Sequence, residues 1–198
     1  SQEKIIKVKN DLIKNKADYL LVTAPENVAW ILNIRGHDST FSPIPNARLL
    51  MSNKGDIDLY SHPKKLEKIK KIFSKKIRFH SEDMLKKRLN NLWKKNILLD
   101  SISCSIHYRN LLEKRNKIIE KIDPIYLHKS IKNRIEIKNM KKSHMIDGVA
   151  LTKFLFWLKK NFKKKKITEI SAQKKLEDFR KMDKAYKFPS FSTISGSG

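Results

Sequence analysis

Short apolar segments alternate with helical segments over the first two-thirds of the chain, and this alternation limits the possible folds most. Segments with helical spacing or helix-start residues separate the apolar runs. Strands that alternate with helices favour one α/β domain, which we expect to end near residue 131. The predicted strands are 18–22, 47–51, 57–60, 77–79 and 97–100, and the predicted helices are 3–15, 25–35, 63–73, 82 onwards and 105–115.

Several local signals predict where these elements end. Pro25 and Glu26 are typical of a first helical turn, and glycine can adopt the left-handed C-terminal cap, so we expect that helix to end at Gly36. Residues 53–56 contain the Lys-Gly-Asp expected of a hairpin turn. Ser81 precedes two acidic residues and is expected to cap the next helix.

The pattern changes after residue 131. One long helix is predicted from Asn133 to about Phe162, and a second helix should begin after Thr168. Residues 188–198 resemble a strand that ends in glycines and has no partner strand after it. We therefore expect a second domain over 132–198 that is begun but unfinished. Its predicted buried stripe on the long helix is Ile137, Met140, His144, Gly148, Leu151, Leu155, Leu158 and Phe162, and that on the second helix is Ala172, Leu176, Phe179 and Met182.

The charge is strongly positive, with 45 Lys and Arg against 20 Asp and Glu, a net charge of +25. One interpretation is nucleic-acid binding through phosphate neutralisation. The other is a solvated basic surface, which we favour because the lysines are spread along the whole chain. We expect no specific nucleic-acid site and, without a long apolar run, no membrane span. The single Cys104 cannot form an internal disulfide, so a cytoplasmic setting fits best.

Few residues match a known catalytic or metal-binding pattern. His144 and Asp147 have the i,i+3 spacing of two metal ligands on one helix, although a packed histidine explains the position equally well. Cys104 and His107 could form a nucleophile and its base only if they lie in contact. The final Gly196-Ser-Gly198 reads either as a flexible tail or as a turn leading into an active site.

Three segments together resemble the Xaa-Pro aminopeptidases of the pita-bread metallopeptidases. The first, 17–36, contains AWILNIRG; the second, 132–148, resembles the helix that opens the catalytic domain; the third reads FPSFSTISGSG at 188–198. The resemblance implies a creatinase N-terminal-like (ribonuclease-H-like) α/β domain over 1–131, followed over 132–198 by the helical start of a pita-bread α+β domain.

The resemblance also implies an activity that this segment does not complete. The family removes the N-terminal residue from peptides with proline in second position, using two divalent metal ions, usually manganese. Their ligands would follow residue 198, so we expect no catalytic residue and no metal in this segment, and no activity of the segment alone. A homodimer in the cytoplasm is expected for the complete enzyme.

Three residues are predicted to touch substrate by resemblance: Arg35 and His37 in the loop after the second helix, and Phe191 before the final glycines. Arg35 could instead cap the helix, and Phe191 could instead pack in a core. The alternatives for the whole chain are a prolidase or creatinase relative and a non-enzymatic basic binding module.

Overall fold

The computed structural model describes residues 2–73, 76–164 and 166–196. Its backbone divides into two compact units. The first is formed by residues 1–39 and 43–131, and the second by residues 132–198 together with 40–42.

The first unit is built on a six-stranded sheet in the order β4-β3-β2-β1-β5-β6. The pairs β1–β2 and β2–β3 are antiparallel, whereas β3–β4, β1–β5 and β5–β6 are parallel. The predicted α/β class is therefore confirmed, with a mixed sheet. The strands are β1 (Tyr19–Val22), β2 (Arg48–Ser52), β3 (Ile57–Tyr60), β4 (Ile77–His80), β5 (Asn96–Leu99) and β6 (Lys117–Glu120).

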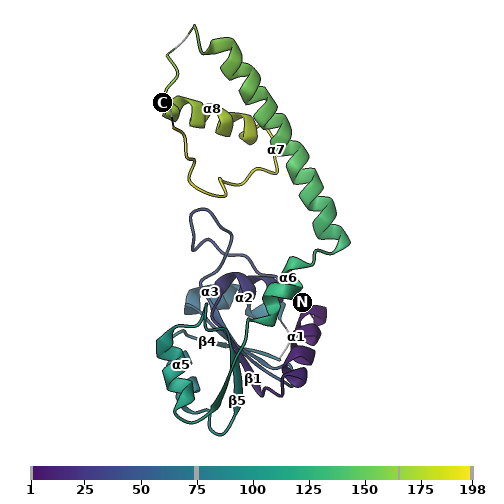
Figure 1. Cartoon of the computed structure of the whole chain (residues 1–198), viewed down its shortest axis with the longest axis vertical. Helices are drawn as coiled ribbons and strands as arrows, with labels where there is room; N and C mark the ends of the chain where they lie inside the picture. Colours follow the sequence, from purple (N-terminus) through teal and green to yellow (C-terminus); the bar gives the residue numbers. More distant parts are fainter. Residues whose placement is uncertain (1, 74–75, 165, 197–198) are drawn as a thin grey trace. The chain divides into compact units, whose positions relative to one another are not determined.

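Helices cover both faces of this sheet, with α1 and α5 on opposite sides of β1 and β5 in Figure 1. Successive strand residues point to opposite faces, so Leu20 joins one buried cluster and Leu21 the other. The first cluster is completed by α1, α2, α3 and α6, and the second by α4 and α5. The helices are α1 (Gln2–Lys14), α2 (Pro25–Leu32), α3 (Pro63–Ile69) with the 3₁₀ turn η1 (Lys70–Ile72), α4 (Met84–Asn90), α5 (Ile106–Glu113) and α6 (Pro124–Ser130).

Two predicted helix ends are wrong. Helix α2 stops at Leu32, because Asn33 adopts the left-handed conformation (φ 55°) and its N–H donates to the carbonyls of Ala29 and Trp30. Asparagine tolerates this conformation better than most residues, so Gly36 is not needed as the cap. Ser81 also does not cap α4, which begins only at Met84 after a turn.

A buried polar link joins α2 to the segment that starts α6. The Asn27 side-chain amide donates to a carboxylate oxygen of Asp123 over 2.8 Å, and Lys129 Nζ donates to the Asn27 amide oxygen over 2.7 Å. The other Asp123 oxygen caps α6 by accepting from the Ile125 N–H. Asn27 and Asp123 are both essentially inaccessible to solvent. This link fixes the end of the unit against α2.

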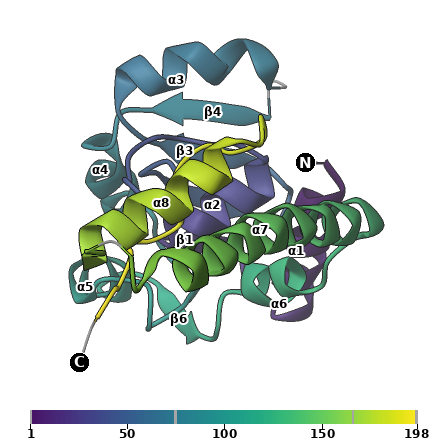
Figure 2. The same cartoon turned by 90° about the horizontal axis from the view of Figure 1, so that it is seen from above.

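The second unit consists of α7 (Arg134–Asn161), α8 (Glu169–Lys181) and the segment after it, with α8 packed against α7 (Figures 1 and 2). Both helices begin as predicted. Asn133 and Glu136 form a capping box at α7, and Thr168 and Ser171 form one at α8.

The buried stripe predicted on α7 is wrong. Ala150 is the one buried residue of α7, and the partly buried Phe154 and Trp157 continue its face, which lies beside the predicted stripe. The predicted Met140 and Leu155 are 48% and 54% exposed. On α8 the predicted inner residues are partly buried except Met182. The described residues 188–196 form no strand, and residues 197–198 of that prediction lie outside the described part of the chain.

Candidate functional site

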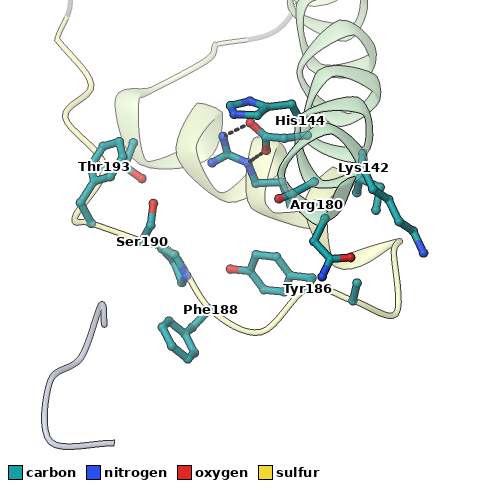
Figure 3. A pocket seen from close by; sticks show the side chains of 14 residues that line it. Lys142, His144, Arg180, Tyr186, Phe188, Ser190 and Thr193 are labelled. Atoms are coloured by element: carbon teal, nitrogen blue, oxygen red, sulfur yellow. Dashed lines mark hydrogen bonds and ion pairs between the residues drawn. The ribbon is translucent and has the colours of Figure 1, made fainter. Parts of the chain in front are cut away.

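A hollow of about 730 Å³ lies in the second unit. Its lining comes from α7, from Arg180 near the end of α8, and from the irregular segment 185–193 (Figure 3). Two features of the sequence contribute to it. Helix α7 carries several of the polar lining residues, and Pro189 disfavours helix at the residue before it, within the irregular segment after α8. The hollow contains the predicted Phe191 as well as His144 and Asp147.

The centre of this lining is an ion pair between α7 and α8. Arg180 Nε lies 2.6 Å from Asp147 Oδ1, and Arg180 Nη2 lies 3.3 Å from Oδ2 (Figure 3). Both carboxylate oxygens of Asp147 are thus engaged by one guanidinium, a two-point geometry that fixes orientation. The i,i+3 metal hypothesis for His144 and Asp147 is therefore not supported. No cluster of three His, Cys, Asp or Glu side chains suited to a metal exists among the residues that the structure describes.

A second group of polar contacts holds Tyr186, which also lines the hollow. The Tyr186 hydroxyl donates to Glu177 Oε1 over 3.2 Å, and Lys181 Nζ lies 2.8 Å from the same oxygen. The hydrogen bond from Lys181 lowers the pKa of Glu177, and partial burial raises the pKa of Tyr186. Tyr186 therefore stays a neutral hydrogen-bond donor. Phe191 lines the hollow but remains 67% exposed, so it is not packed in a core within this unit.

The predicted residues Arg35 and His37 lie in the first unit, in the loop between α2 and β2, and both are exposed. Arg35 Nη1 donates to the Ile34 carbonyl over 2.9 Å, one residue beyond the capped end of α2. The guanidinium thus bonds a carbonyl just beyond the helix and not one of the helix itself. Arg35 and His37 belong to the first unit and Phe191 to the second. The structure therefore describes each of these residues only within its own unit.

Three contacts close the loop that carries Arg35 and His37. Asp38 accepts from the Asn46 N–H and pairs with Lys65 on α3, each over 2.6 Å. The hydrogen bond from Lys65 is the largest effect on Asp38 and holds the pKa of its carboxyl below the usual value. The Gly36 N–H donates to the Pro43 carbonyl over 3.1 Å. The loop is thus tied at its base while its two candidate side chains stay accessible.

Glycine at position 36 is required by close approach rather than by backbone conformation. A Cβ atom at this position would lie 2.6 Å from Pro45 Cα, closer than real Cβ contacts allow. We expect Gly36→Ala to lower the free energy of unfolding by about 1–3 kcal/mol, because the Pro45 backbone must move. Thermal or urea unfolding of the chain measures this.

Gly148→Ala is the matched control for that substitution. A Cβ at Gly148 meets no atom within 4 Å among the described residues, and the site lies inside α7. Alanine there should be neutral or stabilise the helix by up to about 1 kcal/mol. Equal stability of the two variants would show that the Pro45 contact does not constrain the loop.

The structure gives no support to Cys104 and His107 as a nucleophile and its base. Cys104 is buried, its thiol donates to the Ser105 carbonyl, and burial raises its pKa to about 11. The thiol is therefore protonated near neutral pH and poorly nucleophilic. His107 instead makes an edge contact with the ring of Tyr108.

Comparison with known proteins now decides the family. The sequence profile of the creatinase/prolidase N-terminal domain matches residues 1–136, more than half of the chain. The chain belongs to the creatinase/prolidase N-terminal domain family. Within this family the described α/β unit is the matched region, and the match ends two residues after α7 begins.

Curated relatives extend the similarity beyond the creatinase/prolidase N-terminal domain. Xaa-Pro aminopeptidase 1 of Dictyostelium discoideum is 34% identical over 98% of this chain, and Xaa-Pro aminopeptidase ApepP of Drosophila melanogaster is 31% identical over 96%. In both cases the match covers 32% of the relative. The chain thus spans about a third of the length of the curated relatives it matches.

Two solved structures of peptidases share the fold. X-prolyl aminopeptidase from Caenorhabditis elegans, described as a cytosolic enzyme with a di-nuclear active site, superposes with a TM-score of 0.84 at 24% identity, over 98% of this chain and 33% of that one. The prolidase from Pyrococcus horikoshii gives a TM-score of 0.65 at 23% identity, over 91% of this chain and 48% of its own. None of the described helices has the length and apolarity needed to cross a membrane.

The sequence reasoning missed Arg180 and Tyr186 as lining residues. Arg180 meets Asp147 across 33 positions, a separation that helical spacing alone does not connect. The available signal was the segment Tyr186–Pro189, in which two aromatic residues precede a proline shortly after the end of α8.

Proposed function

We propose that this chain is the middle domain and the beginning of the catalytic domain of a Xaa-Pro aminopeptidase. The parent enzyme would release the N-terminal residue from peptides with proline in second position. The observation that carries the proposal is the similarity of almost the whole chain to curated Xaa-Pro aminopeptidases, at up to 34% identity. A creatinase or prolidase activity, or binding without catalysis, is less well supported because the named relatives at 30% identity and above are aminopeptidases.

The boundary between the two parts is proposed at residues 131 and 132. The capping box at Asn133 starts a new helix there, directly after the β-sheet unit ends with α6. Residues 132–198 would then be the first helices of a pita-bread domain. The proposed enzyme acts in the cytoplasm as a homodimer.

The proposed parent uses two divalent metal ions, with manganese the expected metal. The described residues do not fit a two-metal centre, because no three carboxylates or histidines come together among them. The metal ligands are therefore assigned to parts of the parent outside the described residues. When bound, such a pair of metals activates water for attack on a peptide carbonyl.

The contribution proposed for this chain is to position the peptide. Arg35 presents a guanidinium whose described hydrogen bond uses only Nη1, leaving other donors for a peptide carbonyl or carboxylate. His37, two residues further along the same loop, is a second exposed polar group. Phe191 offers an exposed aromatic face at the rim of the α7–α8 hollow, suited to an apolar side chain of the substrate. Proline in the substrate lacks an N–H and fixes φ, so recognition must rely on shape and on carbonyl contacts.

The parent enzyme tests the proposed function directly. Purified full-length protein with manganese should cleave Arg-Pro-Pro after arginine, and a peptide with alanine in place of the first proline should be cleaved much more slowly. Release of a dipeptide product, or equal cleavage of the two peptides, would argue against this specificity.

Arg35→Ala should lower kcat/KM of the parent about 10- to 100-fold while leaving Tm nearly unchanged. The expected factor corresponds to one hydrogen bond to a charged group, about 1.5–3 kcal/mol. Stability should hold because the side chain is exposed and bonds only to the neighbouring carbonyl. Lys68→Ala, an exposed cation on α3, is the control for charge and should leave kcat/KM unaltered. Unchanged kinetics of the Arg35 variant would remove this residue from the substrate site.

A further inference from the structure

The first unit contains a cationic pocket that the proposed peptidase function does not use. The pocket has a volume of about 390 Å³ and lies where β3, β4 and α4 meet. The polar residues that matter here are Asp58 and Tyr60 on β3, Arg78 and His80 on β4, and Lys87 and Arg88 on α4. The register of the two parallel strands sets Asp58 beside Arg78 and Tyr60 beside His80.

One buried carboxylate organises the cations of this pocket. Asp58 Oδ1 lies 2.6 Å from Arg78 Nε and 3.1 Å from His80 Nε2, and Oδ2 lies 3.5 Å from Arg88 Nε. Burial would raise the pKa of Asp58, but the hydrogen bonds from Arg78 and His80 outweigh it and leave the pKa below the usual value. Asp58 is therefore ionised at neutral pH; it accepts a hydrogen bond from Arg78 Nε and forms a longer ion pair with Arg88.

The positive charge exceeds what Asp58 can neutralise. Two arginines and Lys87 give three positive charges against one negative charge in the lining. Asp56 also lies close enough to Arg78 to raise its pKa, but Asp56 does not line the pocket. One guanidinium would be enough to neutralise the Asp58 carboxylate. The pocket therefore has more positive charge than a structural ion pair needs.

Several donors of these cations have no partner within the described part of the chain. Arg78 bonds to Asp58 through Nε, and its Nη groups form no further hydrogen bond there; the Arg78 side chain is 52% exposed. Arg88 Nε is buried and makes no hydrogen bond with a described residue, although it forms an ion pair with Asp58 Oδ2 at 3.5 Å and its guanidinium lies over the ring of Tyr19. Lys87 makes no ion pair or hydrogen bond with a described residue. The Nη groups of Arg78 and the ammonium of Lys87 are therefore available to an incoming acceptor.

An aromatic wall completes the pocket. The rings of Tyr60 and His80 stack with centroids 5.1 Å apart. Burial raises the pKa of Tyr60 to about 12, so its hydroxyl remains protonated. The pocket thus combines the guanidinium groups of two arginines, the ammonium group of Lys87 and a flat side formed by the stacked rings.

We propose that this pocket binds a small oxyanion, a phosphate group or a dicarboxylate, between Arg78, Lys87 and Arg88. The guanidinium fork matches the oxygen spacing of both groups, and the surplus of positive charge requires a dianion for balance. The ligand would bridge β4 and α4. The site is separate from the residues proposed to contact peptide, so it stands whether or not the aminopeptidase assignment is correct.

Titration of the ¹⁵N-labelled chain with inorganic phosphate, and separately with malonate, tests this proposal at constant ionic strength. Saturable backbone shifts should concentrate in β3, β4 and α4, with sodium chloride at the same ionic strength as the reference. Tighter binding of phosphate assigns a phosphate ligand, and tighter binding of malonate assigns a dicarboxylate. Shifts spread over the surface, or reproduced by chloride, would mean screening of the net charge of +25 and would overturn the site.

Lys87→Gln and Lys86→Gln form a matched pair on α4, because both lysines are exposed and only Lys87 lines the pocket. Lys87→Gln should raise Kd about fivefold, the effect of one partly solvated charge contact, and Lys86→Gln should leave it unchanged. Arg78→Lys keeps the charge beside Asp58 but removes the fork, and it should weaken binding further. Equal affinities of the two lysine variants would refute the proposal without any question of misfolding.

Discussion

Limited trypsin digestion of the 198-residue chain should cut region 132–198 first and leave region 1–131 protected. The reason is the unequal burial of the two units. The first unit has two buried clusters on the two faces of its sheet, whereas Ala150 alone is buried among the described residues of the second. Segments with few buried apolar contacts open locally at low free-energy cost.

The size of this difference is expected to be about 100-fold or more in cleavage rate, since local opening needs far less free energy than global unfolding. Lysines occur throughout both regions, so trypsin has sites in each and the order of cleavage reports structure. Mass spectrometry of the time course identifies the fragments. Hydrogen exchange provides a second measurement free of protease specificity. Equal protection of both regions would contradict the prediction and the boundary at residue 131.

Asn27→Ala should lower the free energy of unfolding of the first unit by about 2–4 kcal/mol, which corresponds to roughly 10 °C in Tm. The substitution removes the donor to a buried Asp123 oxygen and the acceptor for Lys129. Asp123 then keeps a buried carboxylate oxygen that water cannot reach, and an unpaired buried acceptor is costly. Thermal unfolding by circular dichroism measures the loss.

The pH dependence of that loss separates this mechanism from a packing defect. Burial raises the pKa of Asp123 above its ordinary value of 3.8, and the hydrogen bonds from Ile125 and Asn27 limit the rise. A raised carboxyl pKa costs stability as pH increases above the unfolded-state value. Without Asn27 the pKa rises further, so the loss should be larger at pH 7 than near pH 4.

Asn10→Ala on the exposed face of α1 is the control and should change stability by less than about 0.5 kcal/mol. A loss in Asn27→Ala that is the same at both pH values would point to a cavity instead of an unpaired carboxylate. A variant as stable as the natural chain would show that the polar link contributes nothing.

The fold of the first unit was largely predictable because its strands are strongly apolar and its hairpin has a clear turn. Gly55 in that turn has φ 93°, a positive value that glycine adopts more readily than other residues. Strand β6 and helix α6 were missed. The β6 sequence, Lys117 to Glu120, has only two apolar residues between charges, and a strand so short lacks a readable alternation.

The second unit was predicted less well because periodicity does not tell which face of a helix is covered. Helix α7 carries apolar residues around much of its circumference, including Ile137, Met145 and Phe156. Helix α8 covers only the face of Ala150, and no local rule selects that face from the others. The capping boxes, by contrast, depend on residues three apart and were readable directly.

The candidate sites follow the same division between local and distant contacts. The loop with Arg35 and His37 was predicted by resemblance to the family and stays a prediction, whereas the contact of Arg180 with Asp147 depends on the packing of two helices. The cationic pocket left a signal that could have been read. Polar residues occupy the second and fourth places of both β3 and β4, and the parallel register brings them together.

The order of the sheet leaves β4 and β6 as its two outermost strands. An outermost strand has unpaired backbone groups on one side and can recruit a strand from another molecule. Both of these strands are four residues long and carry charges, Arg78 on β4 and Lys117 and Glu120 on β6. Short, charged edge strands disfavour pairing with a strand from another molecule. Both edges of this sheet are therefore protected against intermolecular β-aggregation.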